Sequence, residues 1–232
     1  MSKLKVIFVP AMVSDHRVWQ PVTDLLAELI EPTIARCDGG SIAECAHSIL
    51  ADAPDRFVVA GISMGGYVAL EVALRAGSRL AGLVLVNTNA RAASRVQLQR
   101  SGALREVARL GAVDAVAQKM ATGVGGGKRQ VETLAADMLR VLGRDVYLRQ
   151  QAAVLGRGDR RHELPRITVP TLVIAGDDDH ICPPSMANEI ARSVAGAELD
   201  ILPSGHLSTV EVPDLVAASL RDWLARRTEA LA

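Results

Sequence analysis

The stretch Phe57-Val-Val-Ala-Gly-Ile-Ser-Met-Gly-Gly66 decides how the rest of the chain is interpreted. Its first four residues form a short, apolar, partly β-branched run that is typical of a buried strand. Residues 61–65 then match the pattern G-x-S-x-G, and a helical pattern follows from Tyr67 to Arg75. A strand, a sharp turn and a helix in this order predict a nucleophile elbow with Ser63 raised at its tip.

Glycine on both sides of the serine has a physical reason. We expect a strained backbone at Ser63, with the neighbouring chain so close that side chains at positions 61 and 65 would clash. The first amides of the helix would then face an anion that forms at the hydroxyl. The alternative is a glycine-rich turn whose serine only caps the helix, so the decision depends on partners elsewhere in the chain.

The composition is that of one large soluble domain, with 232 residues, 49% of them apolar and 22% charged. Lys plus Arg and Asp plus Glu both number 26, so no global field indicates nucleic acid or membrane partners. The apolar run before Pro10 is too short for an export signal or a membrane span. Cys37, Cys45 and Cys182 show neither paired nor metal-ligand spacing, which predicts free thiols in a reducing cytoplasm.

The order of the apolar patterns indicates the fold class. Six short apolar or β-branched runs are expected to be strands, at residues 6–9, 32–35, 57–60, 83–86, 171–175 and 199–202. Helical patterns lie between or after them, at residues 19–29, 41–50, 67–75 and 213–224. This alternation predicts an α/β fold, with a mostly parallel sheet of about six strands and helices on both faces.

One long segment breaks this alternation. Residues 90–164 contain no strand-like run, and helical patterns are expected there at about 94–109, 111–121, 129–142 and 145–155. A flexible joint is expected at Gly123-Val-Gly-Gly-Gly127. The sequence therefore predicts a helical cap at 90–164, inserted into a core made of residues 1–89 and 165–232.

A serine hydroxyl needs a base to become a nucleophile, and the base needs an orienting carboxylate. His206 follows the last expected strand, at the sheet edge where sites of parallel sheets assemble. Three carboxylates follow the strand at 171–175, and Asp179 suits the role best because it lies mid-loop, with Asp177 second. The chain order Ser63, Asp179, His206 matches the order nucleophile, acid, base.

These motifs make the chain resemble an α/β-hydrolase of the small lactonase and esterase branch over nearly its whole length. The family's G-x-x-D-x-x-x-P appears as Gly176-Asp-Asp-Asp-His-Ile-Cys-Pro183, and its C-terminal G-H as Gly205-His206. Its first loop usually reads His-Gly and then an oxyanion residue, where this chain has Pro10-Ala-Met12. By this register the resemblance implies Met12 and Met64 as the oxyanion amides. It also places the chain's start at the family's third strand, without the leading hairpin.

The resemblance implies hydrolysis of a small carboxylic ester or lactone through an acyl-enzyme on Ser63, with no metal or organic cofactor. Ala11 and His180 are the expected substrate contacts, although a surface position for His180 stays open. Other readings are C–C bond cleavage or perhydrolysis by the same triad, or a binding or signalling protein with little turnover. The sequence leaves open whether the chain forms a homo-oligomer.

Charge is distributed unevenly between the two expected parts. The segment 90–164 contains 14 Lys and Arg against 7 Asp and Glu, a net charge of +7, while the remainder carries −7. Arg91, Arg95, Arg105 and Arg109 recur near helical spacing. Such a row usually forms a solvated face. The sharper hypothesis is that a cap arginine binds an anionic substrate, since the family's enol-lactonases act on carboxylate-bearing lactones.

Overall fold

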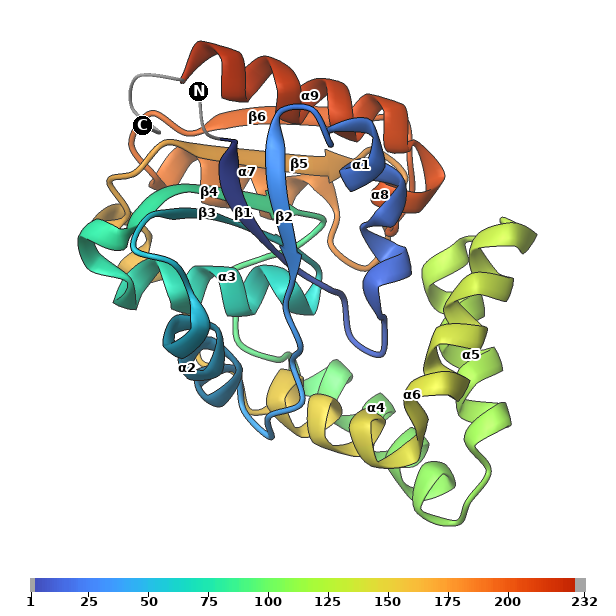
Figure 1. The fold of residues 1–232 in the computed structure, drawn as a ribbon. Helices are drawn as coiled ribbons and strands as arrows, with labels where there is room; N and C mark the ends of the chain where they lie inside the picture. Colours follow the sequence, from blue (N-terminus) through green and yellow to red (C-terminus); the bar gives the residue numbers. More distant parts are fainter. Residues whose placement is uncertain (1–2, 228–232) are drawn as a thin grey trace.

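A six-stranded, all-parallel sheet forms the centre of the computed structural model, which describes residues 3–227 (Figure 1). Its strands are β1 (Leu4–Val9), β2 (Ile30–Ile34), β3 (Phe57–Ile62), β4 (Leu80–Val86), β5 (Thr171–Gly176) and β6 (Glu198–Leu202). They lie in the order β2-β1-β3-β4-β5-β6. The predicted α/β class and the sheet of about six strands are confirmed.

The position of each strand in the sheet explains its composition. Every residue of β3, β4 and β5 is buried, as expected for strands covered on both faces by helices. Strand β2 lies at an edge and includes Pro32, which lacks the N–H that a central strand would need. Edge strand β6 is likewise only partly buried.

Helices cover both faces of the sheet. One face is covered by α1 (Gln20–Leu25) and α9 (Pro213–Arg226), the other by α2 (Ile42–Asp52), α3 (Met64–Arg75) and α7 (Pro184–Ser193). Because side chains alternate along a strand, β1 contributes to both layers. Val6 and Phe8 pack in the core against α1 and α9, whereas Ile7 and Val9 pack in the core against α2 and α3.

The first helix is shorter than the predicted 19–29. It ends at Leu25, after which consecutive tight turns lead directly into β2 at Ile30. Leu25 and Leu29 are consequently 42% and 45% exposed, and residues 26–29 lie outside the helix that was predicted to include them. Across residues 3–227, no helix combines the length and apolar character that a membrane span requires.

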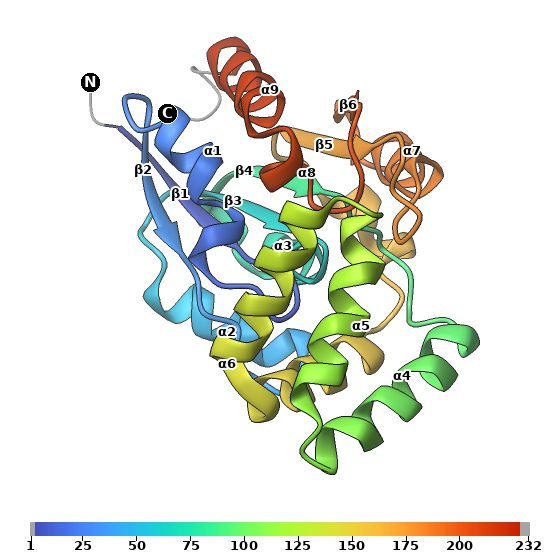
Figure 2. The same ribbon diagram turned by 90° about the vertical axis from the view of Figure 1, so that its right-hand side faces the viewer.

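The insertion between β4 and β5 is helical, as predicted. It consists of α4 (Arg95–Arg109), α5 (Val113–Gly125) and α6 (Arg129–Leu155), and Figure 2 shows α5 and α6 in front of the sheet. The helices predicted at 129–142 and 145–155 are the two halves of α6. They meet at Gly143, where φ is 82° and ψ is 176°. This conformation is accessible essentially only to glycine.

The predicted flexible joint at 123–127 was wrong for residues 123–125. Gly123 and Gly125 belong to α5, and only Gly126 and Gly127 form the turn, with φ of 56° and 87°. A β-carbon at Gly125 would overlap the Glu132 side chain of α6. We infer that this glycine is used for close packing of α5 against α6 rather than for flexibility.

Candidate active site

The turn between β3 and α3 has the geometry of a nucleophile elbow. Ser63 adopts φ 53° and ψ −115°, outside the common regions for a residue with a side chain. A β-carbon at Gly61 would overlap the backbone of Gly65, and one at Gly65 would overlap the carbonyl of Val9. Both glycines are therefore required for the strand, turn and helix to approach this closely.

Neighbouring segments hold the strained turn in place. The Ser63 amide donates to the Val86 carbonyl at 3.0 Å, which extends the β3–β4 pairing by one residue. The Thr88 hydroxyl donates to the Ser63 carbonyl at 2.8 Å. These two bonds fix the backbone on both sides of the Ser63 side chain, so the hydroxyl is presented from a rigid support.

Ser63, His206 and Asp179 meet at the carboxyl edge of the sheet although they follow three different strands. His206 Nε2 lies 2.9 Å from Ser63 Oγ, and His206 Nδ1 lies 2.8 Å from Asp179 Oδ2. Asp179 is 1% exposed and His206 is 5% exposed. The three residues selected from the sequence thus form one continuous, largely buried hydrogen-bonded chain.

The Asp179 carboxylate is held in its ionised form. Burial by itself would raise its pKa, but the hydrogen bond and charge of His206 oppose this. The amides of Ile181 and Cys182 also donate to Asp179 Oδ1, at 2.8 and 2.9 Å. Together these partners lower the pKa of Asp179 below its ordinary value. A negative charge therefore faces the ring nitrogen of His206.

The residues that support the His206 loop were not predicted from the sequence. Asn87, which directly follows β4 and has φ 46°, places its amide nitrogen 2.6 Å from the His206 carbonyl and 2.9 Å from that of Gly205. The Glu211 carboxylate accepts from the amides of Gly205 and Leu207, on either side of the histidine. Asn87 is a polar residue directly after a buried strand, and this position in the sequence could have identified it as a candidate site residue.

The other two aspartates of the loop after β5, Asp177 and Asp178, do not contact His206. Asp177 accepts a hydrogen bond from the Ser204 amide at 3.1 Å, which ties its loop to the loop that carries His206. Asp178 is exposed and pairs with His180, whose side chain is 88% exposed. Of the two positions left open for His180, substrate contact or surface, the structure shows the surface, because His180 does not line the cavity described below. The neighbouring Ile181 lines that cavity instead.

The two amides expected to bind an oxyanion come from two different segments of the fold. Met64 is the first residue of α3, and Met12 belongs to the loop after β1. Within residues 3–227, neither amide is used in a hydrogen bond. The Met64 side chain is buried in the core, whereas the Met12 side chain lines the cavity.

A cavity of about 260 Å³ lies over Ser63 and His206, between the core and the cap. Its walls come from the loop after β1, from α5 and α6, and from the loops before α7 and α8. The lining residues are Ala11, Met12, Val13, Ser14, Ser63, Met120, Ala121, Gly123, Val124, Ala135, Leu139, Ile181, His206 and Leu207. Within the described part of the chain, no Lys, Arg, Asp or Glu belongs to this lining, so the cavity is apolar apart from its hydroxyls, backbone and histidine.

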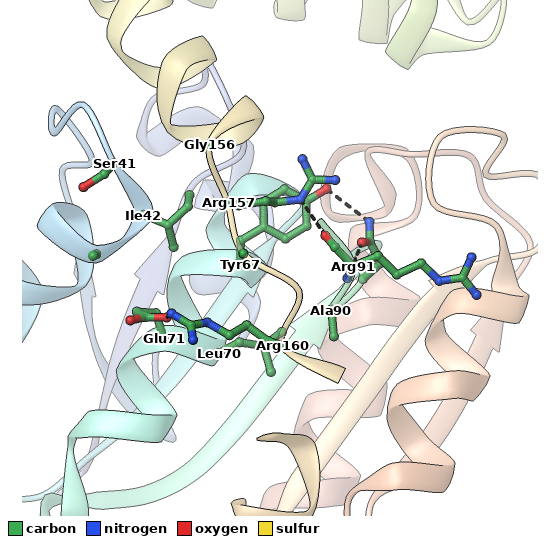
Figure 3. Close-up of a pocket in the computed structure, with 13 residues that line it drawn as sticks. Ser41, Ile42, Tyr67, Leu70, Glu71, Ala90, Arg91, Gly156, Arg157 and Arg160 are labelled. Carbon is green, nitrogen blue, oxygen red and sulfur yellow. Dashed lines mark hydrogen bonds and ion pairs between the residues drawn. The ribbon is translucent and has the colours of Figure 1, made fainter. Parts of the chain in front are cut away.

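Three arginines of the segment 90–164 line a different, smaller cavity of about 120 Å³, beside the start of α2 (Figure 3): Arg91, Arg157 and Arg160. Arg157 lies over the Tyr67 ring, 4.3 Å from its centroid, and donates to the Arg91 carbonyl at 2.9 Å. Arg160 pairs with Glu71 at 2.6 Å. The cationic groups of this cavity are therefore engaged within the chain.

This smaller cavity lies next to the residues that hold Asp179 in place. The Asn89 amide nitrogen lies 3.2 Å from the Tyr67 hydroxyl and 3.4 Å from the Cys182 sulfur. Cys182 in turn donates its backbone amide to Asp179. Burial raises the pKa of the Cys182 thiol to about 12, so this sulfur acts as a neutral packing group.

A nucleophile elbow on a parallel sheet, with a histidine and an aspartate in hydrogen-bonding order and a helical insertion above, defines the class of α/β-hydrolases. Residues 6–219 match the model of the alpha/beta hydrolase family, and the chain belongs to this family.

The sequence of this chain is similar to parts of several curated proteins. The chain is 27% identical over 159 residues to 3-oxoadipate enol-lactonase 2 of Acinetobacter baylyi, covering 66% of this chain and 58% of that protein. It is 41% identical over 69 residues to proline iminopeptidase PfmaB of Pestalotiopsis fici, covering 29% of this chain and 25% of that protein. These matches span about a quarter to three fifths of the curated relatives' length.

Solved structures show the same fold over almost the whole chain. The enol-lactonase of Burkholderia xenovorans superposes with a TM-score of 0.86 at 24% identity, covering 97% of this chain and 92% of that structure. A malate-bound thermophilic esterase of Thermogutta terrifontis has a TM-score of 0.85 at 24% identity, covering 100% and 92%.

Proposed function

We propose that the protein is a serine hydrolase that cleaves a small carboxylic ester or lactone through an acyl-enzyme on Ser63. The observation that carries this proposal is the hydrogen-bonded chain from Ser63 through His206 to Asp179 at the wall of an apolar cavity. A protein that only binds a ligand has no need for this order of nucleophile, base and carboxylate.

The acylation step follows from the position of each group. Asp179 holds the His206 proton on Nδ1, so Nε2 is free to accept the Ser63 proton as Oγ attacks the substrate carbonyl carbon. The carbonyl oxygen becomes an oxyanion that the amides of Met12 and Met64 stabilise. When the tetrahedral intermediate collapses, the bond to the leaving alkoxide breaks and His206 transfers its proton to that oxygen.

Deacylation repeats these steps with water as the nucleophile. His206 accepts a proton from water, the resulting hydroxide attacks the acyl carbon, and the same two amides bind the second oxyanion. Collapse releases the carboxylic acid and returns the proton to Ser63 Oγ. In a lactone, the leaving oxygen stays attached to the acyl group, so the product is a single hydroxy acid.

The cavity favours small, uncharged substrates. Ligand cavities commonly have volumes of about 300–1,000 Å³, so a volume of about 260 Å³ lies just below this range. A buried carboxylate would need a paired cation, and the described lining offers none. This disfavours the hypothesis that a cap arginine binds an anionic substrate. The similarity to an enol-lactonase and an esterase supports the ester or lactone class.

Covalent labelling tests the nucleophile directly. We expect a fluorophosphonate to label the protein on Ser63, with peptide mass spectrometry locating the adduct, and we expect it to abolish hydrolysis of p-nitrophenyl butyrate. The variant Ser63→Ala should lose about 10⁴-fold or more in kcat while keeping the wild-type circular dichroism spectrum. Turnover within tenfold of the wild type by this variant would refute the serine mechanism.

A further inference from the structure

Gln150 is a buried amide in the second half of α6 that joins two loops of the core to the cap. Its side-chain oxygen accepts a hydrogen bond from the Val13 amide at 2.6 Å. Its side-chain nitrogen donates to the Cys37 carbonyl at 2.8 Å. Gln150 is 4% exposed, so both bonds are shielded from water, and each of the two backbone groups would be costly to leave unpaired.

The residue that receives this bond is strained. Val13 has φ 51°, a left-handed conformation that is unfavourable for a β-branched side chain and persists only where the surroundings enforce it. Its side chain is buried in the cap cluster against residues that include Val116, Leu139 and Tyr147. The loop after β1 is therefore held by the cap in two ways, through packing of Val13 and through its hydrogen bond to Gln150.

Met12, whose amide is assigned to the oxyanion in the proposed function, directly precedes this strained residue. The Val13 N–H that Gln150 binds belongs to the peptide between Met12 and Val13, so this bond fixes the backbone on the C-terminal side of Met12. If it were lost, rotation about the two backbone bonds of Met12 would redirect the Met12 N–H. We propose that Gln150 is a positioning residue, which holds the oxyanion loop (residues 10–14) so that the Met12 amide faces the substrate oxygen that becomes the oxyanion when Ser63 attacks. This inference rests on the proposed function, and it means that the cap helps to position the oxyanion site.

The chain offers a matched control for a role that is only structural. Gln151 is the next residue of the same helix and is also 4% exposed, but it does not contact the Val13 amide. Gln150→Met keeps the side-chain volume and removes both hydrogen bonds, and Gln151→Met makes the same chemical change one position later. Thermal unfolding of the two variants measures the general cost of the replacement.

Kinetics separate positioning from stability. For p-nitrophenyl butyrate we expect Gln150→Met to lower kcat by about 10- to 100-fold with KM changed by less than about threefold, because a misplaced donor weakens only the transition state. A trifluoromethyl ketone, which forms a tetrahedral adduct with a serine, should lose affinity by a similar factor. Gln151→Met should stay within about threefold of the wild type in both measurements.

Hydrogen exchange tests the same proposal without any substrate. The Val13 amide should exchange slowly in the wild type and in Gln151→Met, and at least tenfold faster in Gln150→Met. Equal protection in all three proteins, or losses in kcat and ketone affinity that are equal for both variants, would overturn the role of Gln150. A wild type that neither hydrolyses esters nor reacts with fluorophosphonate would instead refute the proposed function, while the exchange result would still decide whether Gln150 holds the loop.

Discussion

His206 Nε2 lies 2.9 Å from Ser63 Oγ, although 143 positions separate the two residues in the sequence. The parallel topology accounts for this contact, because β3 and β6 both end at the same edge of the sheet. The two strands are separated by β4 and β5, so the loop after β6 must reach back to the elbow. Asn87, at the end of β4, contacts that returning loop and fixes its path.

Substitution of the three aspartates in the β5 loop should give sharply different results. Asp179→Asn removes the charge that faces His206 and favours the wrong ring tautomer, so we expect kcat to fall by about 10³- to 10⁴-fold. Asp178 is exposed, and Asp178→Asn should retain activity within about twofold. Steady-state kinetics on the three single variants decide the assignment.

Asp177→Asn provides the closer control. Asp177 accepts from the Ser204 amide, so its loss should reduce thermal stability and affect kcat only modestly. A loss in kcat at Asp177 that exceeds the loss at Asp179 would show that the carboxylate has been assigned to the wrong residue.

The ionisation of Asp179 should be visible in the pH dependence of stability. Its folded pKa lies below the unfolded value of about 3.9, so its contribution to stability is fully present above that value. The contribution is lost as the pH falls through the lower, folded pKa. Each unit of separation between the two values corresponds to about 1.4 kcal/mol in the free energy of unfolding.

Carbon-13 NMR of the carboxyl carbon measures this pKa directly. Asp179→Asn identifies the signal, and a titration from pH 6 downwards gives its midpoint. We expect a midpoint below 3.9, together with a falling free energy of urea unfolding in the same range. A midpoint above 3.9 would mean that burial outweighs His206 and the two backbone amides.

The backbone at Gly143 predicts a stability effect that no side-chain contact explains. Nothing lies within 4 Å of a β-carbon placed there, yet its φ of 82° and ψ of 176° strongly disfavour any other residue. Gly143→Ala should therefore destabilise the protein by about 1–3 kcal/mol. Gly102→Ala, also in open space but within α4, should instead be stabilising by about 0.5–1 kcal/mol. Urea unfolding of both variants compares the two effects.

Local patterns were sufficient to predict the sheet, the elbow and the break in α6. Each of these depends on neighbours in sequence: apolar runs for β3 and β4, a glycine pair around Ser63, and an isolated glycine at position 143. The first helix was overestimated because Leu25 and Leu29 fit a helical stripe, while the need to return the chain to β2 lies outside any local pattern.

The three residues of the hydrogen-bonded chain could be predicted because their motifs occur in a fixed order along the sequence. The residues whose positions depend on how loops and the cap pack could not. His180 was named as a possible substrate contact, with a surface position left open. However, the carboxylate turns inward onto the amides of Ile181 and Cys182, which leaves the histidine outside. Gln150 carries no sequence signal at all, since a glutamine within a helix is ordinarily a surface residue.

Substrate charge and size should both affect turnover. The cap as a whole carries an excess of positive charge, but its arginines lie away from the cavity over Ser63, and Arg157 and Arg160 are engaged beside the smaller cavity. We therefore expect a neutral butyrate ester to have a kcat/KM at least tenfold higher than its ω-carboxylate analogue. Because the preference arises from desolvation in an apolar cavity and not from distant charges, it should persist from low to high salt.

Chain length gives the second arm of this experiment. A cavity of about 260 Å³ should accept acetyl and butyryl groups and reject a dodecanoyl chain, so kcat/KM should fall steeply beyond about six carbons. Leu139→Ala, which removes volume from the wall contributed by α6, should shift the optimum towards longer acyl groups, whereas Leu98→Ala on an exposed face of α4 should not. A preference for the carboxylate analogue would contradict the assignment of this cavity to neutral substrates. A long-chain optimum in the wild type would contradict the small volume of the cavity.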